Sequence, residues 1–236
     1  MTFKREKTQL NVPFRHMRIA AISAVLVLII SCAGTAVLYN VGVRYVPTET
    51  APKDIKETRS TVPVTVARFQ DVRNVDDKIV IGRVYSADKK SLPVLPKYKK
   101  PSESIIKALE DFMTRDGFSV SVVHPDWNLQ EDSIDESWGT ILLGGTINDF
   151  FIECDRSEPV KKYRARVDLT LVLADIQSKQ ILYKVSVESS PSRDHIRFSE
   201  IMMERELNRA LSQAIEQVFA GDAFLSKIEH ISKKSR

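Results

Sequence analysis

The sequence predicts an α+β domain: an antiparallel sheet of about five to six strands, covered on one face by two helices, after an N-terminal signal or anchor helix. Three observations predict it. Several segments alternate apolar and polar residues, which is typical of strands with one buried and one wet face. Two longer segments repeat apolar residues at helical spacing. Strand and helix segments follow each other in the order β-β-α-β-β-β-β-α-α, which favours α+β over a doubly wound sheet.

The predicted strands are recognised by β-branched or alternating residues. They span residues 62–69, 78–85, 118–123, 138–152, 163–173 and 181–188. The segment 138–152 is apolar on both faces at its start, so we expect it in the centre of the sheet. Its pair Gly144-Gly145 indicates a bulge or a close backbone approach. In the last two strands alternate residues share one face, namely Tyr163, Ala165, Val167, Leu169, Leu171 and Leu173, followed by Ile181, Tyr183, Val185 and Val187.

Helices are predicted over 102–116 and about 198–220. Pro101 or Ser102 begins the first helix, and Gly117 stands where a left-handed cap belongs. Gly221 ends the second, and a last short helix follows. The segments 88–100, rich in Lys and Pro, and 124–136, rich in acids, are predicted loops. The apolar stripe of the second helix is Met203, Leu207, Ala210, Leu211, Ala214, Ile215 and Val218.

The N-terminus has the features of a secretory signal. A basic segment ends at Arg18, and thirteen uncharged residues follow, Ile19–Ser31. The last three of these residues and the following cysteine, Ile29-Ile30-Ser31-Cys32, resemble a bacterial lipobox. That resemblance implies cleavage before Cys32, diacylation of its thiol and acylation of the new amino terminus, with acyl chains such as palmitate. Residues 1–31 are then a signal peptide, 32–60 a tether and 61–236 a single periplasmic domain.

Two alternatives remain for this segment. Ile19–Tyr39 is 21 residues without a charge, long enough for an uncleaved single-span anchor. The other alternative is ordinary cleavage of a signal peptide near Ala33. All three place the domain outside the cytoplasm. Ala33, instead of Asp, after the lipidated Cys favours the outer membrane by analogy with enteric bacteria.

Charge excludes one class of function. The chain has 35 Lys and Arg against 31 Asp and Glu, and five of those bases and one acid precede residue 32. The remainder therefore holds thirty of each. A neutral domain lacks the basic face that nucleic-acid binding requires, so no nucleic-acid partner is predicted.

The exported part resembles the YajG-like bacterial lipoproteins and, more distantly, auxiliary lipoproteins of ABC-type transporters. The resemblance rests on a strand end of the form V-x-V-x-x-F-x-D-x-R at residues 64–73, on Ile81-Gly82, on Asp116-Gly117-Phe118, and on the G-x-I-x-x-F strand at residues 145–150. It also includes the hairpin 167–187 and Asp222-Ala223-Phe224-Leu225. It implies an envelope lipoprotein without known catalysis and carries over no catalytic residue.

No pattern in the domain predicts a catalytic, cofactor or metal site. His124, His195 and His230 lack metal-ligand spacing, and no nucleotide-binding glycine motif is present. The acidic loop 124–136 is predicted to be solvated, with a cation site as the alternative. The lysines of 89–100 either form a solvated loop or contact anionic headgroups. Cys154 is predicted to be a small buried residue.

The sequence thus predicts a membrane-tethered envelope lipoprotein, not an enzyme, that acts as an accessory, assembly or binding module. Its partners would be the bilayer, through acylated Cys32 or the helix Ile19–Tyr39, and an envelope protein that docks at a sheet edge or at a groove between sheet and helices. A single-span scaffold with the same domain is one alternative. The other is a periplasmic hydrolase, which would gather His124, His195 and the acidic loop in one cavity.

Overall fold

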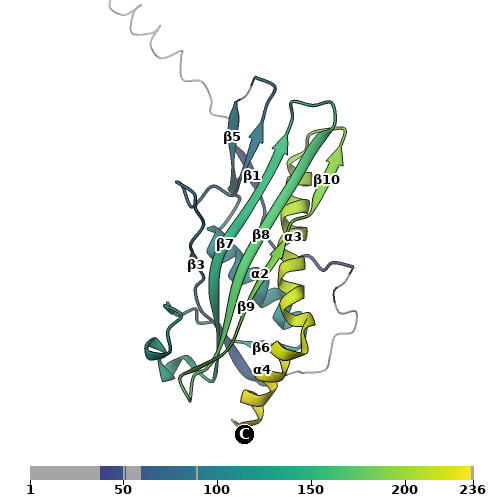
Figure 1. The fold of residues 1–236 in the computed structure, drawn as a ribbon. Coiled ribbons are helices and arrows are strands. Elements are labelled where there is room, and N and C mark those ends of the chain that lie inside the picture. Colours follow the sequence, from purple (N-terminus) through teal and green to yellow (C-terminus); the bar gives the residue numbers. More distant parts are fainter. Residues whose placement is uncertain (1–37, 50, 52–59, 89, 235–236) are drawn as a thin grey trace, which may run out of the picture. The chain divides into compact units, whose positions relative to one another are not determined.

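The structure, a computed structural model, describes residues 38–49, 51, 60–88 and 90–234 (Figure 1). The predicted signal peptide, the lipobox with Cys32 and nearly all of the alternative anchor 19–39 lie outside these residues. Within the described part of the chain, no helix is both long and apolar enough to cross a bilayer.

Ten strands of the described chain form one sheet, and three α-helices pack against it (Figure 1). The strands are β1 Tyr39–Val41, β2 Ser60–Val66, β3 Gln70–Asp71, β4 Gly82–Tyr85, β5 Ser91–Pro96, β6 Phe118–Val120, β7 Ile141–Asp155, β8 Lys161–Asp175, β9 Gln180–Ser189 and β10 Ser192–His195. The helices are α2 Pro101–Arg115, α3 Glu200–Ala220 and α4 Asp222–Lys234.

A long antiparallel hairpin, β7–β8, is the centre of the sheet, as predicted for 138–152. Its strands pair from Ile141↔Asp175 to Asp155↔Lys162. The other edge of β7 pairs in parallel with β2, β3 and β4 in turn, and the other edge of β8 pairs antiparallel with β9 and then β10. The sheet is therefore mixed and larger than the antiparallel sheet of five to six strands that the sequence predicted.

The prediction of a loop over 88–100 was wrong in part, because β5 occupies its middle. Pro93 and Pro96 argued against a strand, since proline cannot donate to a sheet ladder. Pro93 lies outside the three residues of β5 that pair with β1, and Pro96 is the last residue of the strand, paired with Val41. Leu92 and Val94 face the core as strand residues do.

All three helices cover one face of the sheet. The predicted stripe of α3 is buried throughout, and residues of α2, α3 and α4 join the inward residues of β7 and β8 in one apolar cluster. Phe219 links the helices, with its ring centroid 4.7 Å from that of Phe112 and 4.9 Å from that of Phe224. Pro101 begins α2, and Gly117 after it has φ 86°, as predicted.

The opposite face of the sheet is open to solvent toward the β7–β8 turn, where Arg164 and Arg166 are exposed. At the other end, the loop predicted to be solvated covers the sheet with Trp127 and Ile134, which are buried against Leu142 and Val172. These residues form a second apolar cluster. A register shift between Leu173 and Ala174 places Ile181 in this cluster, although the sequence predicted that Ile181 shares a face with Tyr183 and Val185.

Residues 38–49 lie on the domain, although the sequence placed them in the tether 32–60. β1 pairs in parallel with β5, and Tyr39 and Val41 are buried in the main core. The rest of the predicted tether, apart from Ala51 and Ser60, lies outside the described residues.

Candidate binding groove along helix α3

The N-terminal segment, residues 38–49, runs in extended form beside α3 and is hydrogen-bonded to its side chains. Alternate amides of the segment donate to polar residues that recur every fourth position on the helix. Two extended residues advance about 6.6 Å and four helical residues about 6.0 Å, so the two periods nearly match. The pairs are Asn40–Glu200 at 3.4 Å, Gly42–Glu204 at 2.9 Å, Arg44–Asn208 at 3.0 Å, Val46–Ser212 at 2.9 Å and Thr48–Glu216 at 3.0 Å.

Asn208 is the centre of this ladder. Its Oδ1 accepts from the amide of Arg44 and its Nδ2 donates to the carbonyl of Gly42 at 3.0 Å, as a neighbouring strand would. Tyr45 adds a hydroxyl bond to Glu216 at 3.0 Å. Burial and the acceptor Glu216 raise the pKa of the Tyr45 phenol well above its ordinary value, so the phenol stays protonated as the donor.

The sequence of α3 contains a signal for this ladder. The polar residues 200, 204, 208, 212 and 216 are four apart along a helix whose other buried residues, apart from Glu206, are apolar. Three of them, Asn208, Ser212 and Glu216, are buried. Buried polar side chains are nearly always hydrogen-bonded, so such a row predicts a partner strand.

A groove of about 540 Å³ lies between the N-terminal segment, α3 and β10. Four arginines and two glutamates supply its charges. Arg205 is exposed and makes no ion pair with any described residue, whereas Arg44 pairs with Glu204 at 3.5 Å. The groove is therefore suited to an anionic group. Its lining is Arg44, Val46, Pro47, Thr48, Glu49, Arg193, Ile201, Glu204, Arg205, Asn208, Arg209 and Gln213.

A fully buried carboxylate, Glu206, lies beneath the groove. Its Oε1 is 2.6 Å from Arg193 Nε and its Oε2 is 2.5 Å from Arg209 Nη2. A buried charge needs such partners, because its desolvation costs several kcal/mol. These two ion pairs hold both guanidinium groups in place and connect β10 to α3, so this part of the groove is preformed.

The structure does not bring the candidate catalytic residues together. His124 Nδ1 contacts the carbonyl of Val66, which pairs with Leu143, whereas His195 pairs with Lys161 beyond the end of β7. Leu143 and Asp155 are separated by about 40 Å at about 3.3 Å per strand residue. His230 is exposed on α4.

The acidic residues of 124–136 make local contacts. Asp126 pairs with Arg68, Glu131 accepts from the amide of Ile181, and Glu136 pairs with Lys179. Among the residues that the structure describes, no three His, Cys, Asp or Glu side chains are grouped as a metal site.

Cys154 is buried in β7, as predicted. Burial raises the pKa of its thiol to about 11, so the thiol is protonated at neutral pH. Because the thiolate is the reactive form, Cys154 is a packing residue in the native chain.

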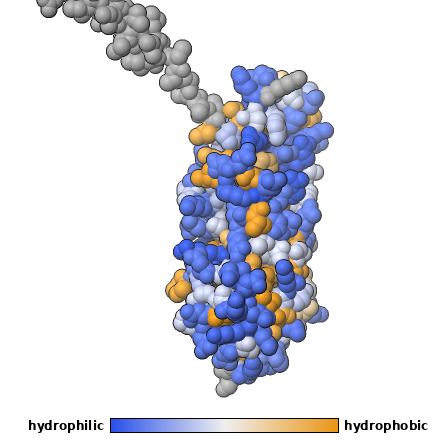
Figure 2. All heavy atoms as spheres, turned by 60° about the vertical axis from the view of Figure 1, so that its left-hand side comes forward, coloured by the Kyte–Doolittle hydropathy of each residue, from blue (hydrophilic) through white to orange (hydrophobic). Residues whose placement is uncertain are grey.

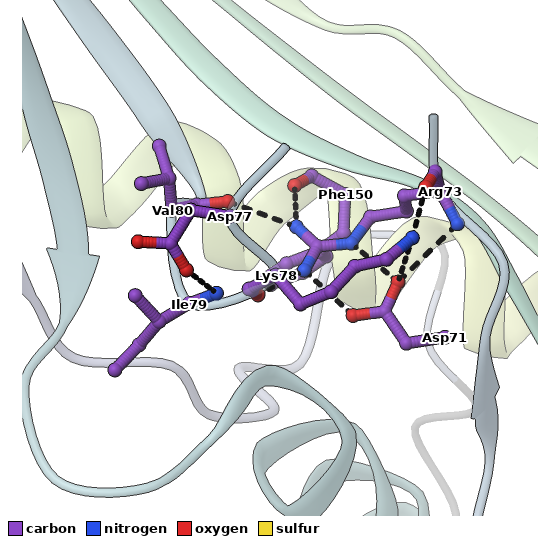
Figure 3. A network of polar contacts seen from close by, with 7 residues as sticks. All are labelled: Asp71, Arg73, Asp77, Lys78, Ile79, Val80 and Phe150. Carbon is purple, nitrogen blue, oxygen red and sulfur yellow. Dashed lines mark hydrogen bonds and ion pairs between the residues drawn. The ribbon is translucent and has the colours of Figure 1, made fainter. Parts of the chain in front are cut away.

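Asp71 and Arg73, the last residues of the V-x-V-x-x-F-x-D-x-R segment, form a buried polar network (Figure 3). Arg73 Nε donates to Asp71 Oδ1 at 2.9 Å and Nη2 to Oδ2 at 2.7 Å. Nη1 donates to the carbonyls of Val80 at 3.1 Å and Phe150 at 3.2 Å. The network thus fastens the loop 74–81 to β7, and its role is structural.

Comparisons with known proteins give a likeness of fold. No family model and no curated sequence matches the chain. Protein XCC0632 from Xanthomonas campestris, of family DUF330, is similar with a TM-score of 0.51 and 11% identity, over 82% of this chain and 99% of that one. A homologue of a neuraminyllactose-binding hemagglutinin from Helicobacter pylori has a TM-score of 0.42 and 14% identity, over 82% and 100%. Lipoprotein GNA1162 from Neisseria meningitidis has 0.37 and 9%, over 68% and 99%.

Of these three structures, only protein XCC0632 has a TM-score above 0.5, and at 11% identity it shows a likeness of fold alone. The resemblance to YajG-like lipoproteins stays a prediction from the motifs of the sequence.

Proposed function

We propose that this chain is a lipoprotein of the bacterial cell envelope, anchored through acylated Cys32, that acts without catalysis as a binding or accessory module. Its partner is an envelope protein that places an acidic segment in the α3 groove. The observation that carries the proposal is this groove, in which exposed Arg205 has no counter-charge among the described residues. The lipobox at Ile29-Ile30-Ser31-Cys32 supports the anchor.

The other functions predicted from the sequence differ in what they require. A periplasmic hydrolase needs His124, His195 and the acidic loop in one cavity, and the described fold separates the histidines by most of β7. A single-span scaffold would use the same groove. In that case Tyr39 is not the end of the membrane helix, because it is buried in β1.

Site-specific photo-crosslinking in living cells tests the groove. Ile201 lines it and is 70% exposed, whereas Val122 is 91% exposed outside it, so the two positions are a matched pair for a photoreactive residue. We expect a protein adduct at position 201 that Arg205→Glu abolishes and Arg68→Glu leaves intact, because Arg68 is also exposed but lies outside the groove, paired with Asp126. Equal adducts at 201 and 122, or an adduct that survives Arg205→Glu, would contradict the proposal.

A further inference from the structure

One end of the domain combines the start of the described chain with two apolar turn residues. We call it the hairpin end: Leu38, the β7–β8 turn (residues 156–160) and the β10–α3 connection (residues 196–199) (Figure 1). Tyr39, the residue after Leu38, contacts both the turn and the connection. Arg156 Nη1 donates to its hydroxyl at 2.8 Å, and its ring centroid is 5.2 Å from that of Phe198. Leu38 therefore lies at this end.

The distance from Leu38 to the predicted anchor is short. Only residues 33–37 separate it from Cys32, and six residue steps reach at most about 20 Å. The tether that the sequence predicted, 32–60, would have allowed the domain to stand farther off. Because residues 38–49 are hydrogen-bonded along α3, most of that length is not available as slack.

The hairpin end also has a surface suited to lipid headgroups. Val160 and Ile196 are 42% and 78% exposed. Each adjoins one member of the last pair of the β8–β10 ladder, Lys161 and His195, along the chain. Basic Lys161 and Arg197 flank them, and Glu158 and Asp194 are the nearby acids. Lys161 Nζ also donates to the carbonyls of Arg156 and Glu158 within the turn. Apolar side chains beside long basic ones are typical of interfacial contacts, where the stems lie along apolar surface and the charges meet phosphate.

From this combination we propose that the hairpin end rests on the headgroup layer of the anchoring membrane, with Val160 and Ile196 at the contact and Lys161 and Arg197 beside phosphate groups. The proposal rests on the membrane anchor of the proposed function. It orients the sheet so that the opposite end points away from the bilayer. That end, marked by Val122, is about 45 Å distant along β7, from Ile141 to Asp155 at about 3.3 Å per residue.

Fluorescence quenching in vesicles tests the orientation. The full chain is purified from membranes as Val160→Cys or Val122→Cys, labelled at the new thiol and reconstituted in phosphatidylethanolamine–phosphatidylglycerol vesicles with spin-labelled headgroups. The unsubstituted chain gives the labelling background, since Cys154 is buried. We expect quenching at 160 to exceed quenching at 122 severalfold. Val122 is the more exposed apolar residue, so exposure alone would predict the reverse.

A second variant tests whether the short linker between Cys32 and Leu38 causes this orientation. Twelve Gly and Ser residues inserted after residue 36 lengthen the reach without touching the described domain, and we expect the excess quenching at 160 to fall at least by half. Chain that floats with the vesicles but is quenched equally at both positions overturns this inference and leaves the anchor intact. Unchanged quenching at 160 in the lengthened chain also overturns it. Chain that fails to float overturns the anchor, and the inference with it.

Discussion

The Arg73 guanidinium is almost completely buried, yet each of its contacts is with a carboxylate or a carbonyl oxygen. This arrangement compensates the desolvation of the charge, and it makes the partners depend on Arg73. Arg73→Met would remove the guanidinium donors of the Asp71 carboxylate and of the carbonyls of Val80 and Phe150, and Asp71 would keep only the amide of residue 73 and Lys78.

We therefore expect Arg73→Met to lower the free energy of unfolding by about 3–5 kcal/mol, measured by urea denaturation. Arg68→Met is the control, because Arg68 forms an exposed pair with Asp126 at 3.4 Å and should cost less than about 1 kcal/mol. Equal losses in the two variants would show that the buried network is not a source of stability.

Asp71 makes this network dependent on pH. Burial raises the pKa of its carboxyl, but the hydrogen bonds and the charge of Arg73 outweigh burial, and the pKa in the folded chain is lowered. Ionised Asp71 therefore stabilises the fold above the unfolded pKa of about 4, and this contribution is lost as the pH falls through the lowered folded value.

The corresponding measurement compares the parent chain with Asp71→Asn. We expect the parent to be the more stable at about pH 7, and the difference in unfolding free energy to shrink toward about pH 3. A difference that stays constant over that interval would mean that the ionisation of Asp71 does not contribute.

At the scale of single elements, the N-terminal segment depends on Asn208. Asn208→Ala removes the acceptor of the Arg44 amide and the donor to the Gly42 carbonyl, and we expect a loss of about 1–3 kcal/mol. Hydrogen exchange should become faster at residues 40–48 and stay unchanged in β8. Arg205→Ala, an exposed change on the same helix, should stay within about 0.5 kcal/mol of the parent. Unchanged protection of residues 40–48 would mean that the ladder does not hold the segment.

Gly145 tests the close approach predicted within β7. A Cβ at this position would meet the Thr170 carbonyl well inside van der Waals contact and Phe69 Cε1 at 2.7 Å. We expect Gly145→Ala to cost about 1–3 kcal/mol in urea denaturation, since strands must shift to admit it. Gly221→Ala is the matched control, because no atom lies within 4 Å of its added Cβ. A neutral Gly145→Ala would contradict the packing of β7 against β8.

Elements with a strong period were predictable, and elements defined by their partners were not. The stripe of α3, Gly117 after α2 and the central place of β7 follow from local residues. β3 has two residues and β1 has three, too few for a period. In β7 a register shift between Ile147 and Asp149 lets Ile147 and Phe150 face the same core at odd spacing, which alternation alone would not place together.

The candidate site was predictable only in outline. A groove between sheet and helices was expected, but its walls come from residues 44–49, β10 and α3, which are remote in sequence. The N-terminal segment was predicted to be part of a tether because the chain becomes polar after Val46 and contains Pro47 and Pro52. Its partners are side chains of α3 more than 150 residues away, so no local signal in the segment identifies them.

At the scale of the whole described chain, the two surfaces that we propose for binding share one helix. α3 starts at the hairpin end, where Leu38 enters, and its flank forms the groove with the N-terminal segment. The face shown in Figure 2 is mostly hydrophilic, with apolar residues in separate patches, so it offers no broad apolar surface for a partner. A partner bound in the groove would thus be held close to the membrane, where the anchor raises its effective concentration.

The proposed function depends first on the anchor, which intact-mass spectrometry of the chain from native membranes tests directly. We expect a mature chain that begins at Cys32 and carries acyl chains on that residue. A chain that still begins at Met1, with an unmodified thiol at Cys32, would contradict it.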